Sequence, residues 1–493
     1  MRGPFFVQGY ENNRSGTVKN LKSLTILAYT VSAVSLAAQD LPSTVVEGQE
    51  SFEMSVLATG FDGPWELTWG PDEYLWVTER TAGRITRVDP KTGSKSVAIE
   101  LPEVVSSAGQ DGLLGLALDP ELGAGTGHDH VYAAYTYTDN DRATKSSDQF
   151  GSLFAKIVRL SYDPESGKLS DPIDLIAGLQ AGGDHNSGRL KLGPDGKLYY
   201  TIGDQGNQQF SNACTPIQAQ TLPTSEEVAT KDYFAYQGKS LRLNLDGSIP
   251  DDNPVFNGVQ SHVFTFGHRN MQGLVFAPDG TLYASEHGPK ADDEVNVLQA
   301  GENYGWPHVS GFVDDMAYQD ASWPDAPNCQ DLQFSDLQIP QGVPVVKESE
   351  WGETGKNPLV TMFTVPTGWD FSDPVCEGMD FICWPTVAPS SLDYYPDRVD
   401  GIPGWGNSLI VPTLKRGSLY LIPLGPDGTS LRGPIERYFQ SENRFRDIAI
   451  NPDGHTFYVA TDPGGVVEAL KGGTTFEMQN PGAILTFEYG NGG

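Results

Sequence analysis

Apolar and polar positions repeat along the chain in one short pattern. A turn rich in Pro, Asp and Gly is followed by an apolar or alternating strand that ends in polar residues. Copies lie at residues 70–79, 193–204, 277–286 and 451–462, with a weaker one at 118–137. The turn has a physical cause, since Pro presets φ, Asp bonds its own backbone and Gly accepts a positive φ. The pattern predicts many short strands joined by tight turns.

Further strands flank several copies, for example 67–69 before the first copy and 84–88 after it. Repeated strand units of this length are typical of a β-propeller. The copies are unevenly spaced, which predicts long loops inserted between strands, at 207–232 and 312–344. A pair of β-sandwiches is the alternative. The repeats favour one propeller over it, because they span nearly the whole chain.

Composition agrees with an all-β chain and excludes some functions. Gly (56) and Pro (35) are too frequent among 493 residues for a helical bundle. A hydrophobic content of 38% is enough for a core, which argues against a disordered chain. The formal charge of −32 argues against nucleic-acid binding, because a polyanion would be repelled.

The amino end has the layout of a secretory signal peptide. Arg14, Lys19 and Lys22 precede an uncharged run, 23–38, that ends in small residues. We expect a signal peptide at 1–37, a flexible segment at 38–51 and a single propeller domain at 52–490. Removing 1–37 would take away four basic residues and one acidic residue, leaving a charge of −35. A membrane anchor is the alternative, but the run is short for a span and no later segment could cross a membrane.

The chain has four cysteines, an even number that suggests disulfides in an exported protein. Cys376 and Cys383 are close enough in sequence to close a small loop, whereas Cys214 and Cys329 lie far apart. Buried free thiols remain the alternative for both pairs. No Cys or His spacing indicates a zinc site.

Polar residues between glycines recur at strand ends, where a propeller would gather them around one mouth. Asp184 and His185 are one such pair, and His185 is a natural proton acceptor near neutral pH. Cationic side chains at the mouth would suit a compact ligand with several carboxylates: Arg269, Lys415, Arg444 and Arg446. The acids at 292–294 and the carbonyls at 288–289 are oxygen ligands of the kind that calcium prefers.

Four longer runs make the pattern specific. They are the segments 199–206, 241–250, 303–307 and 383–391. With these runs the chain resembles the soluble quinoprotein glucose dehydrogenases, which use pyrroloquinoline quinone (PQQ). The resemblance covers about residues 52–490. It implies six four-stranded antiparallel blades, a periplasmic or secreted location, a homodimer, an aldose substrate and an external electron acceptor.

The resemblance also implies roles for individual residues. His185 would be the base for the anomeric hydroxyl, with Arg269 beside the reacting centre and Asp184 at the sugar. Sugar contacts would come from Gln110, Asp184, Gln209 and Trp384. Cofactor contacts would come from Arg269, Asn270, Lys415, Arg444 and Arg446. The cofactor's Ca²⁺ would sit on the carbonyls of Gly288 and Pro289. Further calcium ions would be held by Glu294, Tyr304, Ser310, Phe312, Asp314 and Glu348. Cys376 and Cys383 would form the family's disulfide.

The chain departs from the family pattern at several positions. His287 replaces a glutamine, Phe381 replaces a tyrosine near the pocket, and Phe210 and Asn212 differ on the sugar side. Ser310 and Phe312 also differ, which matters little if only their carbonyls bind. These changes leave the preferred sugar open. Cys214 and Cys329 have no known family counterpart, and a second disulfide between them is a hypothesis.

Three functions therefore compete. The first is a quinoprotein glucose or aldose dehydrogenase. The second is a quinoprotein with the same chemistry on other aldoses or oligosaccharides. The third is a non-enzymatic propeller that binds glycans or proteins, and the presence of both the base and the cationic cluster disfavours it.

Overall fold

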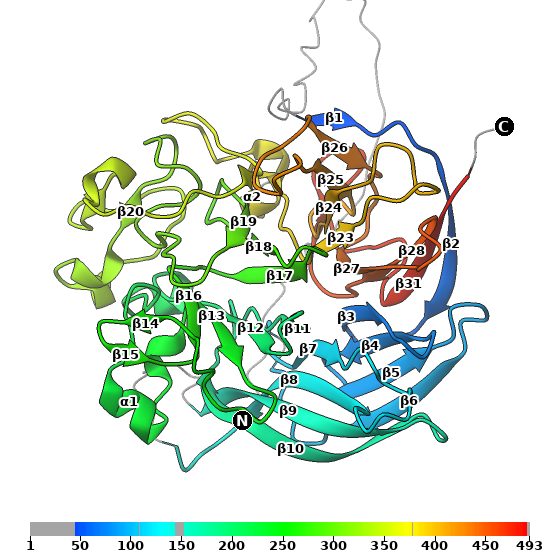
Figure 1. The fold of residues 1–493 in the computed structure, drawn as a ribbon. Helices are drawn as coiled ribbons and strands as arrows, with labels where there is room; N and C mark the ends of the chain where they lie inside the picture. Colours follow the sequence, from blue (N-terminus) through cyan, green and yellow to red (C-terminus); the bar gives the residue numbers. More distant parts are fainter. Residues whose placement is uncertain (1–44, 108, 143–151, 377, 491–493) are drawn as a thin grey trace, which may run out of the picture. The chain divides into compact units, whose positions relative to one another are not determined.

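The computed structural model describes residues 45–107, 109–142, 152–376 and 378–490. Six antiparallel four-stranded sheets dominate these residues (Figure 1). The first three blades, each from its inner to its outer strand, are β3 (Pro64–Trp69), β4 (Leu75–Glu79), β5 (Arg84–Val88), β6 (Lys95–Glu100); β7 (Leu113–Leu118), β8 (His130–Thr138), β9 (Leu153–Asp163), β10 (Lys168–Gln180); and β11 (Leu190–Leu192), β12 (Leu198–Ile202), β13 (Lys239–Leu243), β16 (Val263–Phe266).

The other three blades follow the same order from inner to outer strand. They are β17 (Met271–Phe276), β18 (Leu282–Glu286), β19 (Glu294–Leu298), β22 (Val360–Thr361); β23 (Asp393–Tyr395), β24 (Ser408–Pro412), β25 (Leu419–Pro423), β26 (Ile435–Tyr438); and β27 (Phe445–Ile450), β28 (Thr456–Thr461), β31 (Ala483–Tyr489), β2 (Phe52–Thr59). Short hairpins pair β14 (Val255–Phe256) with β15 (Val259–Gln260), β20 (Asp320–Ala321) with β21 (Val345–Val346), and β29 (Val467–Glu468) with β30 (Thr474–Thr475). The two α-helices of the described residues are α1 (Ser225–Thr230) and α2 (Asp380–Cys383).

The inner strands close a ring. Contacts run from β27 to β3, and onward through β7, β11, β17 and β23 back to β27. Figure 1 shows these strands around the centre, with the later strands of each blade outside them. The amino-terminal strand β2 pairs antiparallel with β31, so the first described long strand completes the last blade. The six-bladed propeller implied by the resemblance is confirmed.

The turns of the repeat, Pro-Asp-Gly in three blades and Pro-Asp-Glu between β3 and β4, lie between the first and second strands of four blades. Asp195 and Asp279 accept hydrogen bonds from the backbone N–H groups of Lys197 (3.1 Å) and Thr281 (2.9 Å). These bonds replace backbone partners that a tight turn cannot supply. Because the turns occupy one end of each inner strand, the other end is left for loops that can carry a site.

A buried ionic cluster ties the inner strands together. Arg189, fully buried, donates hydrogen bonds to Glu66 (2.6 Å), Asp447 (2.9 Å) and the carbonyl of Gln272 (2.8 Å). It also lies over the ring of Trp65, 4.2 Å from the centroid. Its partners belong to β3, β27 and β17, so one guanidinium fixes three blades against the segment before β11. Such a charge is tolerated in the interior only because all these partners compensate it.

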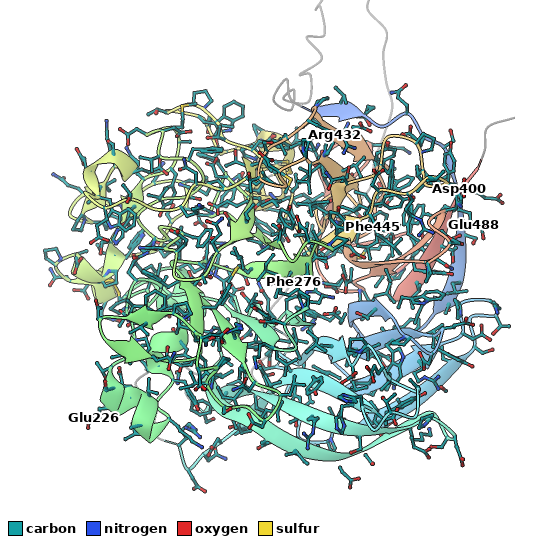
Figure 2. The ribbon with its side chains drawn as sticks, in the orientation of Figure 1. Glu226, Phe276, Asp400, Arg432, Phe445 and Glu488 are labelled. Atoms are coloured by element: carbon teal, nitrogen blue, oxygen red, sulfur yellow. A yellow bond between two sulfur atoms is a disulfide. The ribbon has the colours of Figure 1, made fainter. Side chains whose placement is uncertain are left out.

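The blades otherwise pack through apolar side chains. Figure 2 shows Glu226 of α1 and Glu488 of β31 at the outer edge, whereas Phe445 of β27 lies among the packed side chains and is buried. Among the described residues, no helix has the length and apolar character needed to cross a membrane.

Both cysteine pairs form disulfides. Cys376–Cys383 closes a loop of 7 residues, and Cys214–Cys329 links the two long inserts across 115 residues of sequence. The disulfide expected from the resemblance and the hypothetical second one are therefore both present. The predicted signal peptide at 1–37 lies outside the described residues. In the segment expected to be flexible, Val45–Glu47 forms strand β1, which pairs parallel with β26.

Candidate active site

A cavity of about 650 Å³ opens at the ends of the inner strands opposite the Pro-Asp-Gly turns. Loops before β7, β11 and β17, and the start of β27, deliver its polar residues. Of the residues expected at the sugar and the cofactor, the cavity is lined by Gln110, Asp184, His185, Gln209, Arg269, Trp384, Lys415, Arg444 and Arg446, together with Gly288 and Pro289. Asn270 does not line the cavity and is fully buried beside it. The volume of the cavity lies within the range of about 300–1,000 Å³ that is typical of ligand sites.

His185 forms a buried pair with Asp204. Its Nδ1 lies 2.7 Å from Asp204 Oδ1, and both side chains are almost fully buried. Asp204 also accepts hydrogen bonds from Trp306 Nε1 (2.8 Å) and the backbone N–H of Gly206 (3.0 Å). A carboxylate acceptor assigns the proton to Nδ1, which leaves the Nε2 lone pair free to accept another. The sequence pattern pointed to His185 but gave Asp204 no role.

The backbone at this pair is unusual. His185 has a φ of +45°, a conformation that non-glycine residues rarely adopt. Its carbonyl packs against Gly203, where a Cβ atom would lie 1.9 Å from the oxygen. Only glycine permits this close approach, and it brings the loop before β11 against the end of β12. The strained conformation is consistent with a functional position.

A polar network surrounds the free nitrogen of His185. Gln209 Nε2 donates to Asp184 Oδ2 (3.0 Å) and lies 3.3 Å from His185 Nε2. Gln110 donates to the other oxygen of Asp184. Arg269 Nη2 lies 3.4 Å from Gln209 Oε1, and its guanidinium is 5.5 Å from the Trp306 ring centroid. These groups can bind hydroxyls next to a proton acceptor.

A second part of the cavity lining, the cationic wall, consists of Lys415, Arg444 and Arg446. Burial lowers the pKa of Lys415 to about 7 and that of Arg444 to about 10. Burial alone would raise the pKa of Asp462, but Arg446, Arg444 and Arg80 lower it to about 2. One carboxylate therefore faces several cations. This wall has spare positive charge for an anionic ligand.

Two hydrogen-bond donors are buried without partners among the described residues: Nε of Arg444, which lines the cavity, and Nδ2 of Asn270, which does not. The Asn270 amide is fixed through its oxygen, which accepts from Ser187 N and Oγ (both 3.2 Å) and from Gln272 Nε2 (2.9 Å). Unpaired buried donors are costly, so they indicate a ligand that accepts from them.

His287 keeps its side chain at the cavity wall. Its Nε2 lies 2.9 Å from the carbonyl of Pro389, and its own carbonyl accepts from Arg269 Nη1 at 3.3 Å. Burial, followed by the charge of Arg269, holds the pKa of His287 well below its usual value. The imidazole is therefore neutral, and its backbone carbonyl remains in place beside Gly288.

Acidic residues gather behind the cavity, where further calcium ions were expected. The backbone N–H groups of Ser310 (3.1 Å) and Asp314 (3.2 Å) donate to Glu348, and that of Gly311 donates to Glu294. Burial raises the pKa of Asp292 to about 8, with smaller contributions from Asp314 and Glu348, and its Oδ1 has no partner among the described residues. Tyr304 donates instead to the carbonyl of Val297 (2.6 Å), and Phe312 is partly exposed. Within the described residues, no three His, Cys, Asp or Glu side chains form a ready metal cluster.

Comparisons with known proteins identify relatives of this chain. Residues 61–337 match the family model described as glucose / sorbosone dehydrogenase. Quinoprotein glucose dehydrogenase B of Acinetobacter calcoaceticus is 44% identical over 96% of this chain and 99% of its own. The PQQ-bound aldose sugar dehydrogenase of Streptomyces coelicolor has a TM-score of 0.59 at 26% identity, covering 89% of this chain and 99% of its own. An aldose sugar dehydrogenase of Escherichia coli is 26% identical over 86% of this chain and 93% of its own.

The match to the family model covers more than half of the chain, and the Acinetobacter relative matches nearly all of it. On these grounds the chain belongs to the glucose/sorbosone dehydrogenase family.

Proposed function

We propose that the protein is a quinoprotein dehydrogenase that oxidises the anomeric carbon of glucose or a related aldose to the lactone. The observation that carries this proposal is the pair of His185 and Asp204 at one wall of a cavity whose other wall is cationic. The family relationship supports PQQ as the cofactor.

The residues present fit PQQ, a flat quinone with three carboxylates. Lys415, Arg444 and Arg446 would supply positive charge at the cationic wall, and the unpaired Nε of Arg444 would supply a hydrogen bond. Arginine forks bind carboxylates in pairs, which suits such a ligand. When bound, PQQ supplies a carbonyl centre that accepts a hydride equivalent from the sugar.

The chain's own residues bind the sugar and move one proton. Asp184, Gln110 and Gln209 are placed to hydrogen-bond sugar hydroxyls, displacing the contacts they now make with each other. His185 Nε2 takes the proton from the anomeric hydroxyl, while Asp204 holds the ring and stabilises the imidazolium. Arg269 provides positive charge beside the reacting centre. The sugar thus loses a proton to His185 and a hydride from C1, and the electrons pass to an external acceptor.

Calcium is the second part of the cofactor proposal. The carbonyls of Gly288 and Pro289, at the cavity wall, would hold one ion, which would act as a Lewis acid on the cofactor. A further ion would lie beside Glu294, Asp314 and Glu348, with Tyr304, Ser310 and Phe312 as the other expected contributors. The unpaired Asp292 Oδ1 and the crowded acids support a cation there.

The location and assembly follow as expectations. The signal-like amino end and two disulfides support export to the periplasm or beyond. We expect a homodimer from the resemblance and an electron acceptor outside the chain. The similarity to sugar dehydrogenases favours the enzyme over the alternative of a non-enzymatic glycan- or protein-binding propeller.

Reconstitution tests the proposal. The mature chain is mixed with Ca²⁺, PQQ and glucose, and reduction of an artificial dye is followed. Turnover should require all three additions, and His185→Gln should keep cofactor binding while losing most turnover. If the chain binds PQQ but oxidises no aldose, its substrate belongs to another class. A chain that does not bind PQQ would overturn the proposal.

A further inference from the structure

An arginine of the first blade supports the loop that carries Gln110. Arg80 directly follows β4, and its Nη1 donates to the carbonyls of Gly109 (2.6 Å) and Asp111 (3.1 Å). These two carbonyls lie immediately before and after Gln110 in the chain. Gln110 lines the cavity, whereas Arg80 does not. The guanidinium therefore fixes the backbone on both sides of a residue expected at the sugar.

The main chain of Arg80 contacts the same loop. Its carbonyl accepts a hydrogen bond from the N–H of Leu113 at 3.0 Å. Between the two contacts lies Gly112, with a φ of +133°, where a Cβ atom would lie 2.3 Å from the same carbonyl oxygen. Only glycine permits this approach. Arg80 thus holds the segment 109–113 through its side chain at one end and its main chain at the other.

The far side of the loop contacts the sugar-binding network. The N–H of Gln110 donates to the carbonyl of Gly183 at 2.9 Å, and the Gln110 side-chain amide donates to Asp184 Oδ1. A Cβ atom on Gly109 would lie 2.2 Å from the same Gly183 carbonyl, so the two backbones are in close contact. A continuous series of contacts therefore runs from Arg80 through Gln110 to Asp184.

Gln110 needs such support because its own residue is exposed. A long amide side chain in water has many conformations, and a sugar must select one of them when it binds. A fixed backbone lowers that cost, because fewer torsions are left to order. The guanidinium is suited to this task, since hydrogen bonds from a charged donor are stronger than those between neutral groups. Burial lowers the pKa of Arg80, but an arginine in this setting stays charged.

We propose that Arg80 is a positioning residue that sets Gln110, and through it Asp184, for sugar binding. The inference rests on the proposed function, because it assigns a task within that sugar site. His185 is oriented separately by Asp204, so Arg80 acts on sugar affinity rather than on proton transfer. The alternative is that Arg80 only stabilises the fold, and the test separates the two.

The first arm of the test measures kinetics in the reconstituted enzyme at saturating PQQ and Ca²⁺. Arg80→Met should raise KM for glucose about 5–20-fold and change kcat less than about threefold, the pattern of lost binding without lost chemistry. Arg80→Lys keeps the charge and should recover part of the affinity. Arg432→Met is the matched control. The guanidinium of Arg432 also donates to two carbonyls, those of Asn407 (3.0 Å) and Gly404 (2.8 Å), but it does not line the cavity, so KM should stay unchanged.

A double-mutant cycle then asks whether Arg80 acts through Gln110. Gln110→Ala should itself raise KM for glucose, because it removes the amide that Arg80 positions. Adding Arg80→Met to Gln110→Ala should change KM by less than about twofold, since the residue to be positioned is already absent. Two effects that multiply in full would show that Arg80 acts by another route and would overturn the proposal.

Hydrogen exchange gives a readout that needs no turnover. The amides of Gln110 and Leu113 are both bonded in the contacts described above, so the peptide containing 109–113 should exchange at least about fivefold faster in Arg80→Met and at the wild-type rate in Arg432→Met. An unchanged exchange rate, or an unchanged KM in an active enzyme, overturns the positioning role. If the wild type oxidises no aldose, the proposed function fails, and calorimetry with methyl glucoside decides the role of Arg80 by itself. Weaker binding in Arg80→Met then supports it, and equal binding overturns it.

Discussion

The contact between His185 and Asp204 leads to a specific prediction for Asp204→Asn. Asp204 Oδ1 faces two nitrogens, His185 Nδ1 at 2.7 Å and Gly206 N at 3.0 Å, and Oδ2 accepts from Trp306 Nε1 at 2.8 Å. An asparagine has one oxygen for these donors. If the asparagine NH₂ faces His185, Nδ1 must accept the hydrogen bond, and the ring proton then lies on Nε2. The Nε2 atom can then no longer act as a base. If the NH₂ instead faces Trp306, two donors are placed against each other.

The expected effect is a fall in kcat of about 10²–10⁴, the range associated with a positioned base and its orienting carboxylate. This corresponds to about 3–5 kcal/mol of transition-state stabilisation. Dye reduction at saturating PQQ and glucose gives kcat, and calorimetry gives the cofactor affinity separately. The affinity should stay within about threefold, because Asp204 lies on the sugar side of the cavity rather than at the cationic wall.

Asp320→Asn is the matched control. Its carboxylate pairs with His308 Nδ1 at 2.8 Å, but His308 does not line the active cavity. The control should keep kcat near the wild-type value. An Asp204→Asn enzyme with wild-type kcat would refute the role of Asp204. So would a loss explained entirely by weaker PQQ binding.

Three further predictions follow from the geometry. Since burial lowers the pKa of Lys415 to about 7, most of its side chain is deprotonated at pH 8, and binding of the anionic PQQ should be accompanied by uptake of a proton. Calorimetry in two buffers of different ionisation heat should detect this uptake in the wild type and not in Lys415→Met. Equal binding heats of the wild type in both buffers would contradict the prediction. Chelation of Ca²⁺ should lower the melting temperature of the wild type, because an ion at 100 times its Kd stabilises the folded state by about 3 kcal/mol. The melting temperature of Glu348→Gln should fall much less, and identical falls in both proteins would remove Glu348 from the site. Arg189→Met leaves Glu66 and Asp447 buried and poorly compensated, so denaturant unfolding should show a free energy of unfolding lower by about 3–5 kcal/mol. Replacing the exposed Arg398 by Met should lower it by less than about 1 kcal/mol. An equal decrease in both variants would contradict the role of the ionic cluster.

The site was only partly predictable from the chain. His185, Lys415, Arg444 and Arg446 were found because their residue types, placed at strand ends, carry recognisable chemistry. Asn270 was expected only through the family resemblance and Asp204 was given no role, because the importance of both residues depends on contacts. Asp204 meets Trp306 across 102 residues of sequence, and Asn270 is oriented by Ser187 across 83. A single sequence has no local signal for such pairs.

What the sequence determined by itself is the local structure. The Pro-Asp-Gly turns and the strands after them are fixed by φ preferences and hydrophobic periodicity within about ten residues, so the repeat and the propeller class could be predicted. The tertiary structure decided which strand ends meet. The ring closed by β2 on β31 brings His185, Arg269 and Lys415 into one cavity, and the disulfide between Cys214 and Cys329 joins the two long inserts. These outcomes depend on contacts between segments more than 80 residues apart, and only the packing of the whole chain selects them.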